Sequence, residues 1–208
     1  MALVRAGAPA AGGATRHSGF QGAYSLLALS TFVPLVWIYA KHKHAGPLLW
    51  MTVGPPELAR AVNYALMALA FVLFVASLLP ASTAPSAMLA RGPATVHGMI
   101  RVTRHPMLAS FGLFGVAHLL LNGSLGDVIF FGGFPIFTWV GGRHQDSRKL
   151  HQVPGYESVV GATSILPFGA IIAGRQHLPL RELPVVALGL GLAFAVVVRI
   201  FHHRLFGP

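Results

Sequence analysis

Five long apolar runs limit what this chain can fold into more than any other feature. They cover residues 23–40, 61–79, 106–122, 124–140 and 183–198, and they hold almost no charged side chain. A helix needs about 20 apolar residues to cross the hydrocarbon core of a bilayer. We therefore predict an all-α fold, a polytopic transmembrane helical bundle with about five spans. Pro34 and Pro135 lie inside two of these runs and predict kinks.

The composition supports a membrane protein and excludes several other classes. Only 10% of the 208 residues are charged, against roughly 25% in soluble domains. Lys and Arg number 15 and the acids five, a formal charge of +10, and the basic residues lie in the loops, as is typical of membrane proteins. No nucleic-acid-binding motif accompanies this charge. The absence of cysteine excludes disulfides and thiolate chemistry.

The remaining segments divide the chain and orient it. We set residues 1–22 apart as an N-terminal segment and treat residues 23–208 as one transmembrane domain. Within the polar stretch 141–182, the semi-apolar residues 156–172 predict an interfacial segment. The N-terminus and loops 80–105 and 141–182 together hold ten Lys and Arg residues, against five in the segments on the other side. The positive-inside rule then predicts a cytoplasmic N-terminus and both loops on that side, in an integral membrane protein that we place in the bacterial inner membrane.

His118 is the most informative single residue, because an ionisable side chain inside a span is costly and marks a functional site by default. Neutral imidazole is a common ligand of haem iron. Phe114 precedes His118 by one helical turn and Asn122 follows it by one turn. The alternative is a histidine that only hydrogen-bonds to a neighbouring helix.

A second cluster begins the third apolar run. Pro106 is suited to the first turn of a helix, with Thr103 or His105 as its cap. Arg101 and Arg104 would then form an anion site at the helix N-terminus, or only anchor the chain at the membrane surface. Asp146 stands among Arg143, Arg148 and Lys149, where we expect a solvated ion-pair cluster. We interpret His42, His44, His202 and His203 as interfacial residues.

Several motifs in one order resemble those of the NnrU family of membrane proteins. They are His97-Gly-Met-Ile-Arg-Val-Thr-Arg-His-Pro, Ala117-His-Leu, His144-Gln-Asp-Ser-Arg-Lys, Thr163-Ser-Ile-Leu-Pro-Phe and Ala173-Gly-Arg-Gln. The likeness runs from about Gly22 to the C-terminus. It is strongest to members that isomerise a carotenoid.

The resemblance implies a helical membrane protein that carries haem b and acts as a cis–trans isomerase of an apolar polyene without net redox change. It places the metal ligand of the third span on His118 and the family's arginine-histidine-proline motif on Arg104, His105 and Pro106. We therefore name His118, Arg104 and His105 as cofactor-binding residues and His118 as the metal ligand.

The resemblance also implies a second axial histidine, in a His-Ser-Gly motif on a span that precedes all of those found here. His17-Ser-Gly matches these letters but lies only seven residues before Tyr24, so the ligand is not assigned to His17. Residues 2–5 match the segment that follows the family's motif. We therefore expect the true start of the protein to lie upstream of Met1 in the gene.

Two other functions stay open at this point. One is a non-catalytic NnrU-type protein linked to nitrogen-oxide respiration. The other is a membrane methyltransferase that uses S-adenosylmethionine, because such enzymes also begin a span with Arg-His-Pro. The acids that the methyltransferase would need are few, with Asp146 and Glu157 as the only candidates in the following loop.

Overall fold

The computed structural model describes residues 12–79 and 96–206. Residues 2–5, which we matched to the family, and most of the loop 80–105 therefore lie outside the described residues. The chain forms two compact units, Met1–Lys43 and His44–Pro208, which are considered separately below.

The first unit contains one long helix, α1 (Gly12–Lys41), which is continuous through Pro34. The sequence predicted helix only from residue 23, so the start of the helix was placed too late. Residues 12–22 contain no proline, the residue that most strongly breaks a helix, and their four glycines weaken the helix without ending it. His17 is therefore part of the helix rather than of a polar segment before it.

The second unit is a helical bundle with one small strand pair. Its long helices are α2 (Pro56–Leu78), α4 (Pro106–Leu121), α5 (Leu125–Gln152) and α8 (Val185–Phe206). Its short elements are α3 (Met99–Val102), α6 (Tyr156–Ala162), α7 (Gly169–Ile172) and the 3₁₀ turn η2 (Leu180–Glu182). β1 (Leu48–Trp50) pairs antiparallel with β2 (Gly123–Ser124), with Leu48 opposite Ser124 and Trp50 opposite Gly123.

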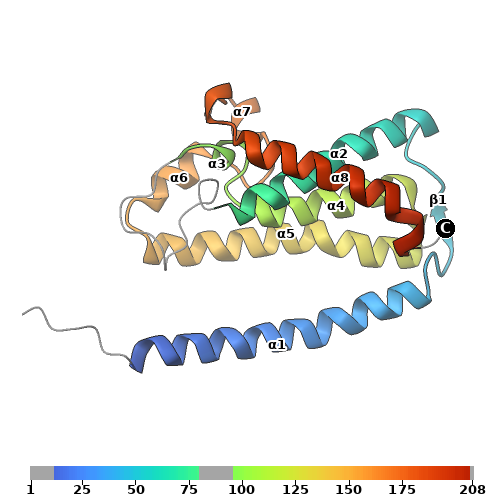
Figure 1. The fold of residues 1–208 in the computed structure, drawn as a ribbon, viewed down its shortest axis with the longest axis horizontal. Coiled ribbons are helices and arrows are strands. Elements are labelled where there is room, and N and C mark those ends of the chain that lie inside the picture. The colour runs from blue at the N-terminus through green and yellow to red at the C-terminus, as the bar shows by residue number, and fades with distance from the viewer. Residues whose placement is uncertain (1–11, 80–95, 207–208) are drawn as a thin grey trace, which may run out of the picture. The chain divides into compact units, whose positions relative to one another are not determined.

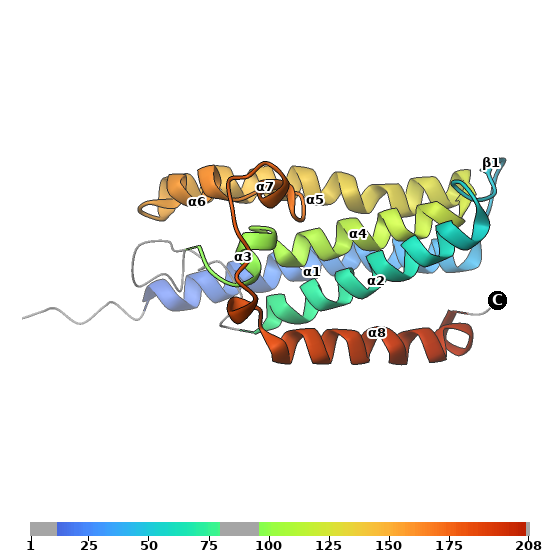
Figure 2. The same cartoon turned by 90° about the horizontal axis from the view of Figure 1, so that it is seen from above.

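The four long helices of this unit lie side by side in the order α5, α4, α2, α8 (Figure 2). The short helices α3, α6 and α7 gather at one end of this row, and β1 lies at the other (Figure 1). The apolar core joins α2, α4 and α8 with α3, through residues such as Leu73, Val102 and Ala187. Each end of α4 therefore meets a different set of elements.

Glycines let α4 and α5 approach closely. A Cβ on Gly112 would lie 2.9 Å from Thr138 Oγ1, and one on Gly115 would collide with the Phe131 carbonyl. The Thr138 hydroxyl donates to the Leu108 carbonyl at 2.6 Å, across the same contact. Small residues and a hydroxyl at a helix contact are the usual means of packing helices in lipid.

All five predicted runs are helical, but the count of five spans is not confirmed. Among the described residues, three helices are long and apolar enough to cross a membrane: Pro56–Leu78, Leu125–Gln152 and Val185–His202. The apolar parts of α1 and α4 are shorter. α4 is short because Pro106 begins it and Asn122 ends it in an extended conformation that leads into β2. Large apolar side chains on these helices are exposed, for example Ile136 at 66% and Val185 at 76%, as expected of surfaces that face lipid.

Candidate functional site

His118 lies in the last turn of α4, at the end of the bundle that carries β1 and β2. Its Nδ1 is 2.8 Å from the carbonyl oxygen of Phe114, and a carbonyl can only accept, so Nδ1 carries the proton. Nε2 is then the nitrogen with a lone pair, and among the described residues it has no hydrogen-bond partner. The imidazole stacks on the Phe131 ring, with centroids 4.4 Å apart, and contacts the Phe114 ring at 4.2 Å.

The last turn of α4 is held by donors from three other segments. The final carbonyls of a helix have no partner within the helix, and inside a membrane they cannot turn to water. Here the carbonyls of Ala117, His118, Leu119 and Leu120 accept from Asn63 Nδ2, Asn122, Trp50 Nε1 and the Val53 N–H. The backbone that carries His118 is therefore fixed on several sides.

An apolar cavity of about 250 Å³ lies close to this histidine, between α2, α4 and α8. Its lining consists of Met67, Ala70, Phe71, Phe74, Ser110, Phe111, Phe114 and Phe194. Phe114 lines the cavity and also contacts the His118 ring, so one aromatic side chain joins the two. The Phe71 and Phe194 rings meet edge to face at 4.9 Å.

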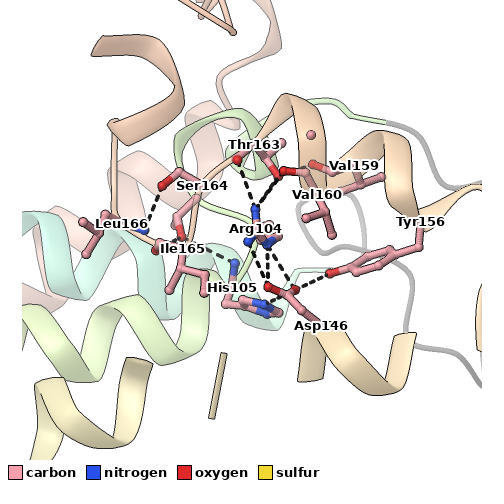
Figure 3. A network of polar contacts seen from close by, with 12 residues as sticks. Arg104, His105, Asp146, Tyr156, Val159, Val160, Thr163, Ser164, Ile165 and Leu166 are labelled. Atoms are coloured by element: carbon pink, nitrogen blue, oxygen red, sulfur yellow. Dashed lines mark hydrogen bonds and ion pairs between the residues drawn. The ribbon is translucent and has the colours of Figure 1, made fainter. Parts of the chain in front are cut away.

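A buried polar network occupies the other end of α4, where α3 and the segment after α5 meet (Figure 3). Arg104 Nε lies 3.0 and 2.9 Å from the two carboxylate oxygens of Asp146, and another guanidinium nitrogen donates to the Thr163 carbonyl at 3.0 Å. His105 Nε2 lies 2.8 Å from Asp146 Oδ1, and the Tyr156 hydroxyl donates to the same oxygen at 3.0 Å. Arg104, His105 and Asp146 are at most 8% exposed.

Two predictions for this end of α4 are wrong. Asp146 was expected in a solvated cluster with its sequence neighbours, but it is buried and is paired with Arg104 and His105. An anion site was one of two alternatives for Arg101 and Arg104, and it is not found, because each guanidinium already binds a carboxylate of the chain. The partner of Arg101 is Glu182, at 2.7 Å. His105 is the N-cap residue of α4, as one alternative had it, but its side chain makes no capping hydrogen bond.

The structure does not bring the three predicted cofactor residues together. His118 follows His105 by thirteen positions, which is about 20 Å along a helix. The two loops that we placed on one side do meet, because Arg104 N donates to the Ser164 carbonyl and Thr103 Oγ1 to the Ile165 carbonyl. His118 therefore belongs to one site, and Arg104 with His105 to another.

Several important residues were missed or undervalued in the sequence. Asp127 caps α5 in a capping box with Ser124 and also pairs with His44 at 2.9 Å, and the Ser-x-x-Asp spacing is the signal that could have revealed the cap. The pairing of Tyr156 with Asp146 gave no signal in the sequence, because Asp146 lies on another helix. Burial, and then the neighbouring Asp146 carboxylate, raise the pKa of the Tyr156 phenol, so it remains a donor.

His118 has one structural feature of an axial haem ligand. Ligating histidines commonly donate their second N–H to a backbone carbonyl, and His118 does so. The described residues contain no cluster of three or more His, Asp or Glu that could hold a metal ion alone. A haem needs fewer protein ligands, because the porphyrin supplies four nitrogens. His202 of α8 lies near enough to His118 for an electrostatic interaction.

Comparison with known proteins supports the resemblance that the motifs indicated. Two curated relatives are named 15-cis-zeta-carotene isomerase, chloroplastic. The protein from Arabidopsis thaliana is 30% identical over 198 residues, covering 85% of this chain and 49% of its own length. The protein from Zea mays is 28% identical over 190 residues, covering 85% and 50%. The chain thus spans about half the length of these relatives, and no solved structure matches it.

A family model described as NnrU protein matches residues 2–208. The match includes the segment 1–22 almost entirely, so the likeness extends further toward the N-terminus than the motifs from Gly22 onward had indicated. The chain therefore belongs to the NnrU family.

Proposed function

We propose that this protein is a haem-dependent cis–trans isomerase of a carotenoid, similar to 15-cis-zeta-carotene isomerase. Family membership and the names of two relatives support the reaction class. The membrane setting suits the substrate, because a long polyene partitions into lipid. The bacterial inner membrane and the cytoplasmic N-terminus stay predictions.

The observation that carries the proposal is the Nε2 atom of His118. Its tautomer is set by the Phe114 carbonyl, and its lone pair has no acceptor role toward any described residue. A bare imidazole nitrogen between aromatic rings, at a helix end braced by other segments, is suited to hold a haem iron. A haem bound there would supply a redox-active iron that lowers the barrier to rotation about a conjugated double bond.

The aromatic cavity is the natural place for the polyene in this proposal. Its volume of about 250 Å³ exceeds the ~150 Å³ of a cavity that binds benzene, so it can take part of a long chain rather than the whole molecule. Phenylalanine rings offer broad apolar contacts to a planar conjugated chain. The residues of this chain would then hold the polyene beside Phe114, exclude water from it, and fix the His118 ring.

The test is conversion of 15-cis-zeta-carotene by the purified protein in detergent or liposomes, followed by chromatography of the isomers. Wild type loaded with haem should isomerise the substrate, and His118→Ala should lose at least ~10-fold in rate. Phe111→Ala, which enlarges the cavity without touching His118, should weaken substrate use while haem absorption is retained.

Other results of this assay would bear on the two alternative functions. Haem binding without isomerisation would favour the non-catalytic NnrU-type function linked to nitrogen-oxide respiration. For the methyltransferase alternative, Asp146 is not available, because its oxygens are occupied by Arg104, His105 and Tyr156, which leaves Glu157 as the remaining candidate acid.

A further inference from the structure

Lys149 is a buried cation whose ammonium group has no hydrogen-bond acceptor among the described residues. It lies in the last turn of α5 and is only 7% exposed. Its Nζ stands over the ring of Tyr156, 5.4 Å from the centroid. A buried lysine without a hydrogen-bonded partner is rare, because burying a charge is expensive unless the charge is paired.

The nearest carboxylate is already occupied. Asp146 attracts Lys149 electrostatically, but its oxygens bind Arg104, His105 and the Tyr156 hydroxyl. Even with the imidazole uncharged, this buried cluster holds two cations and one carboxylate. The negative end of the α5 dipole favours a cation at this position, yet it satisfies none of the three ammonium N–H donors.

The rest of the chain does not supply the missing negative charge. It has five acidic residues, and the other three that pair do so elsewhere, namely Glu57 with Arg60, Asp127 with His44 and Glu182 with Arg101. Glu157 is exposed and forms no ion pair within the described part of the chain. Exposed Arg143 and Arg148, on the same stretch of α5, add further positive potential.

We propose that Lys149, above the Tyr156 ring and beside Arg104, binds the phosphate group of an anionic ligand. An ammonium whose three donors have no acceptor among the described residues suits a phosphate oxygen. The phosphate would supply the one negative charge that the buried cluster lacks. It can come from a lipid headgroup, since the chain lies in a membrane, or from a phosphate-bearing solute. This site lies at the opposite end of α4 from His118 and does not depend on the function proposed above.

The experiment is thermal unfolding of the full chain in detergent, in sodium phosphate against sodium chloride at equal ionic strength. A ligand that binds only the folded state raises the melting temperature. We expect saturating phosphate to raise the melting temperature of wild type by roughly 3–8 °C. Lys149→Met keeps the length of the side chain and removes the charge, so it should lose this rise without melting lower than wild type in chloride.

Two control variants test whether the effect is specific to Lys149, and a measurement in liposomes identifies the source of the phosphate group. Arg148→Met removes a neighbouring exposed cation and should keep the rise, as should Lys149→Arg. In phosphate-free liposomes, stabilisation by phosphatidylglycerol over phosphatidylcholine identifies a lipid headgroup, and a response to free phosphate alone identifies a solute. The proposal fails if neither source stabilises wild type, or if Lys149→Met responds as wild type does. It also fails if Lys149→Met unfolds earlier and wild type shows no anion response, which would make Lys149 purely structural.

Discussion

The two ends of α4 carry similar polar residues but differ in how fully the hydrogen-bonding groups of these residues are satisfied. At one end, Arg104 and His105 bind Asp146, which also accepts from the Tyr156 hydroxyl, and Arg104 donates to the Thr163 carbonyl. At the other end, His118 uses one nitrogen to fix its own ring and leaves the second without a partner among the described residues. A satisfied network stabilises the fold, whereas an unsatisfied nitrogen beside an apolar cavity is available to a ligand. Sequence reasoning had given both ends to one cofactor.

The largest effect on stability should come from breaking the satisfied end. Asp146→Asn leaves the buried Arg104 guanidinium without a counter-charge, and loss of one partner of a buried pair costs about 3–5 kcal/mol. Denaturant unfolding in detergent measures this loss. Glu157→Gln is the matched control, because Glu157 is exposed and should change the free energy of unfolding by under ~0.5 kcal/mol. An Asp146→Asn protein as stable as wild type would show that the network does not hold the fold.

The contact between α4 and α5 connects the two ends. Disrupting it should cause the next-largest loss of stability. Gly115→Ala places a methyl group against the Phe131 backbone and 2.9 Å from Phe134 Cβ, and such overpacking costs ~1–3 kcal/mol. Gly132→Ala in α5 meets nothing within 4 Å and should instead stabilise by up to ~1 kcal/mol through helix propensity. Equal effects of the two variants on the free energy of unfolding would contradict this packing.

Removing one of the hydrogen bonds that hold the His118 end should cost less stability. Asn63 is buried and donates to the Ala117 carbonyl at 2.7 Å. Asn63→Ala leaves that carbonyl unsatisfied, at a cost of ~1–3 kcal/mol, and loosens the turn that carries His118. Ser158→Ala removes only an exposed hydroxyl and should be silent. If Asn63→Ala costs more than Asp146→Asn, the difference between the two ends is not the one described here.

These results also show what the sequence could and could not predict. The apolar runs located both ends of α4, the end of α2 and the start of α8 to within two residues, because lipid imposes length and hydropathy on any span, but they ended α8 eight residues too early. The same pattern ended the fourth run at residue 140, whereas α5 continues through a polar turn to Gln152. His118 could be predicted as a site because it is an ionisable residue within an apolar run of its own helix. The environment of Asp146 could not, because Tyr156 and Arg104 reach it from other elements.

The smallest effect concerns Glu182, at the edge of the satisfied end. Hydrogen bonds from Arg101, and then from the Gly98 N–H, lower the pKa of this carboxyl group. A lowered pKa in the folded state stabilises the protein above the ordinary carboxyl pKa of ~4.3, and the contribution is lost as the pH falls through the folded-state pKa. Glu182→Gln should therefore be slightly less stable than wild type at pH ~7, and the difference should shrink below pH ~4. A difference in melting temperature that is constant with pH would contradict the ion pair.

The most direct test of the contrast between the two ends is the absorption spectrum of the purified protein, oxidised and dithionite-reduced, with haem supplied during expression. Wild type should show a Soret band, and His118→Ala should lose or shift it while its circular dichroism stays close to that of wild type. His202→Ala, measured alongside, should shift the band only if His202 is a second ligand. A Soret band that His118→Ala leaves unchanged, or a wild type that binds no haem, would contradict the assignment of His118 as the ligand.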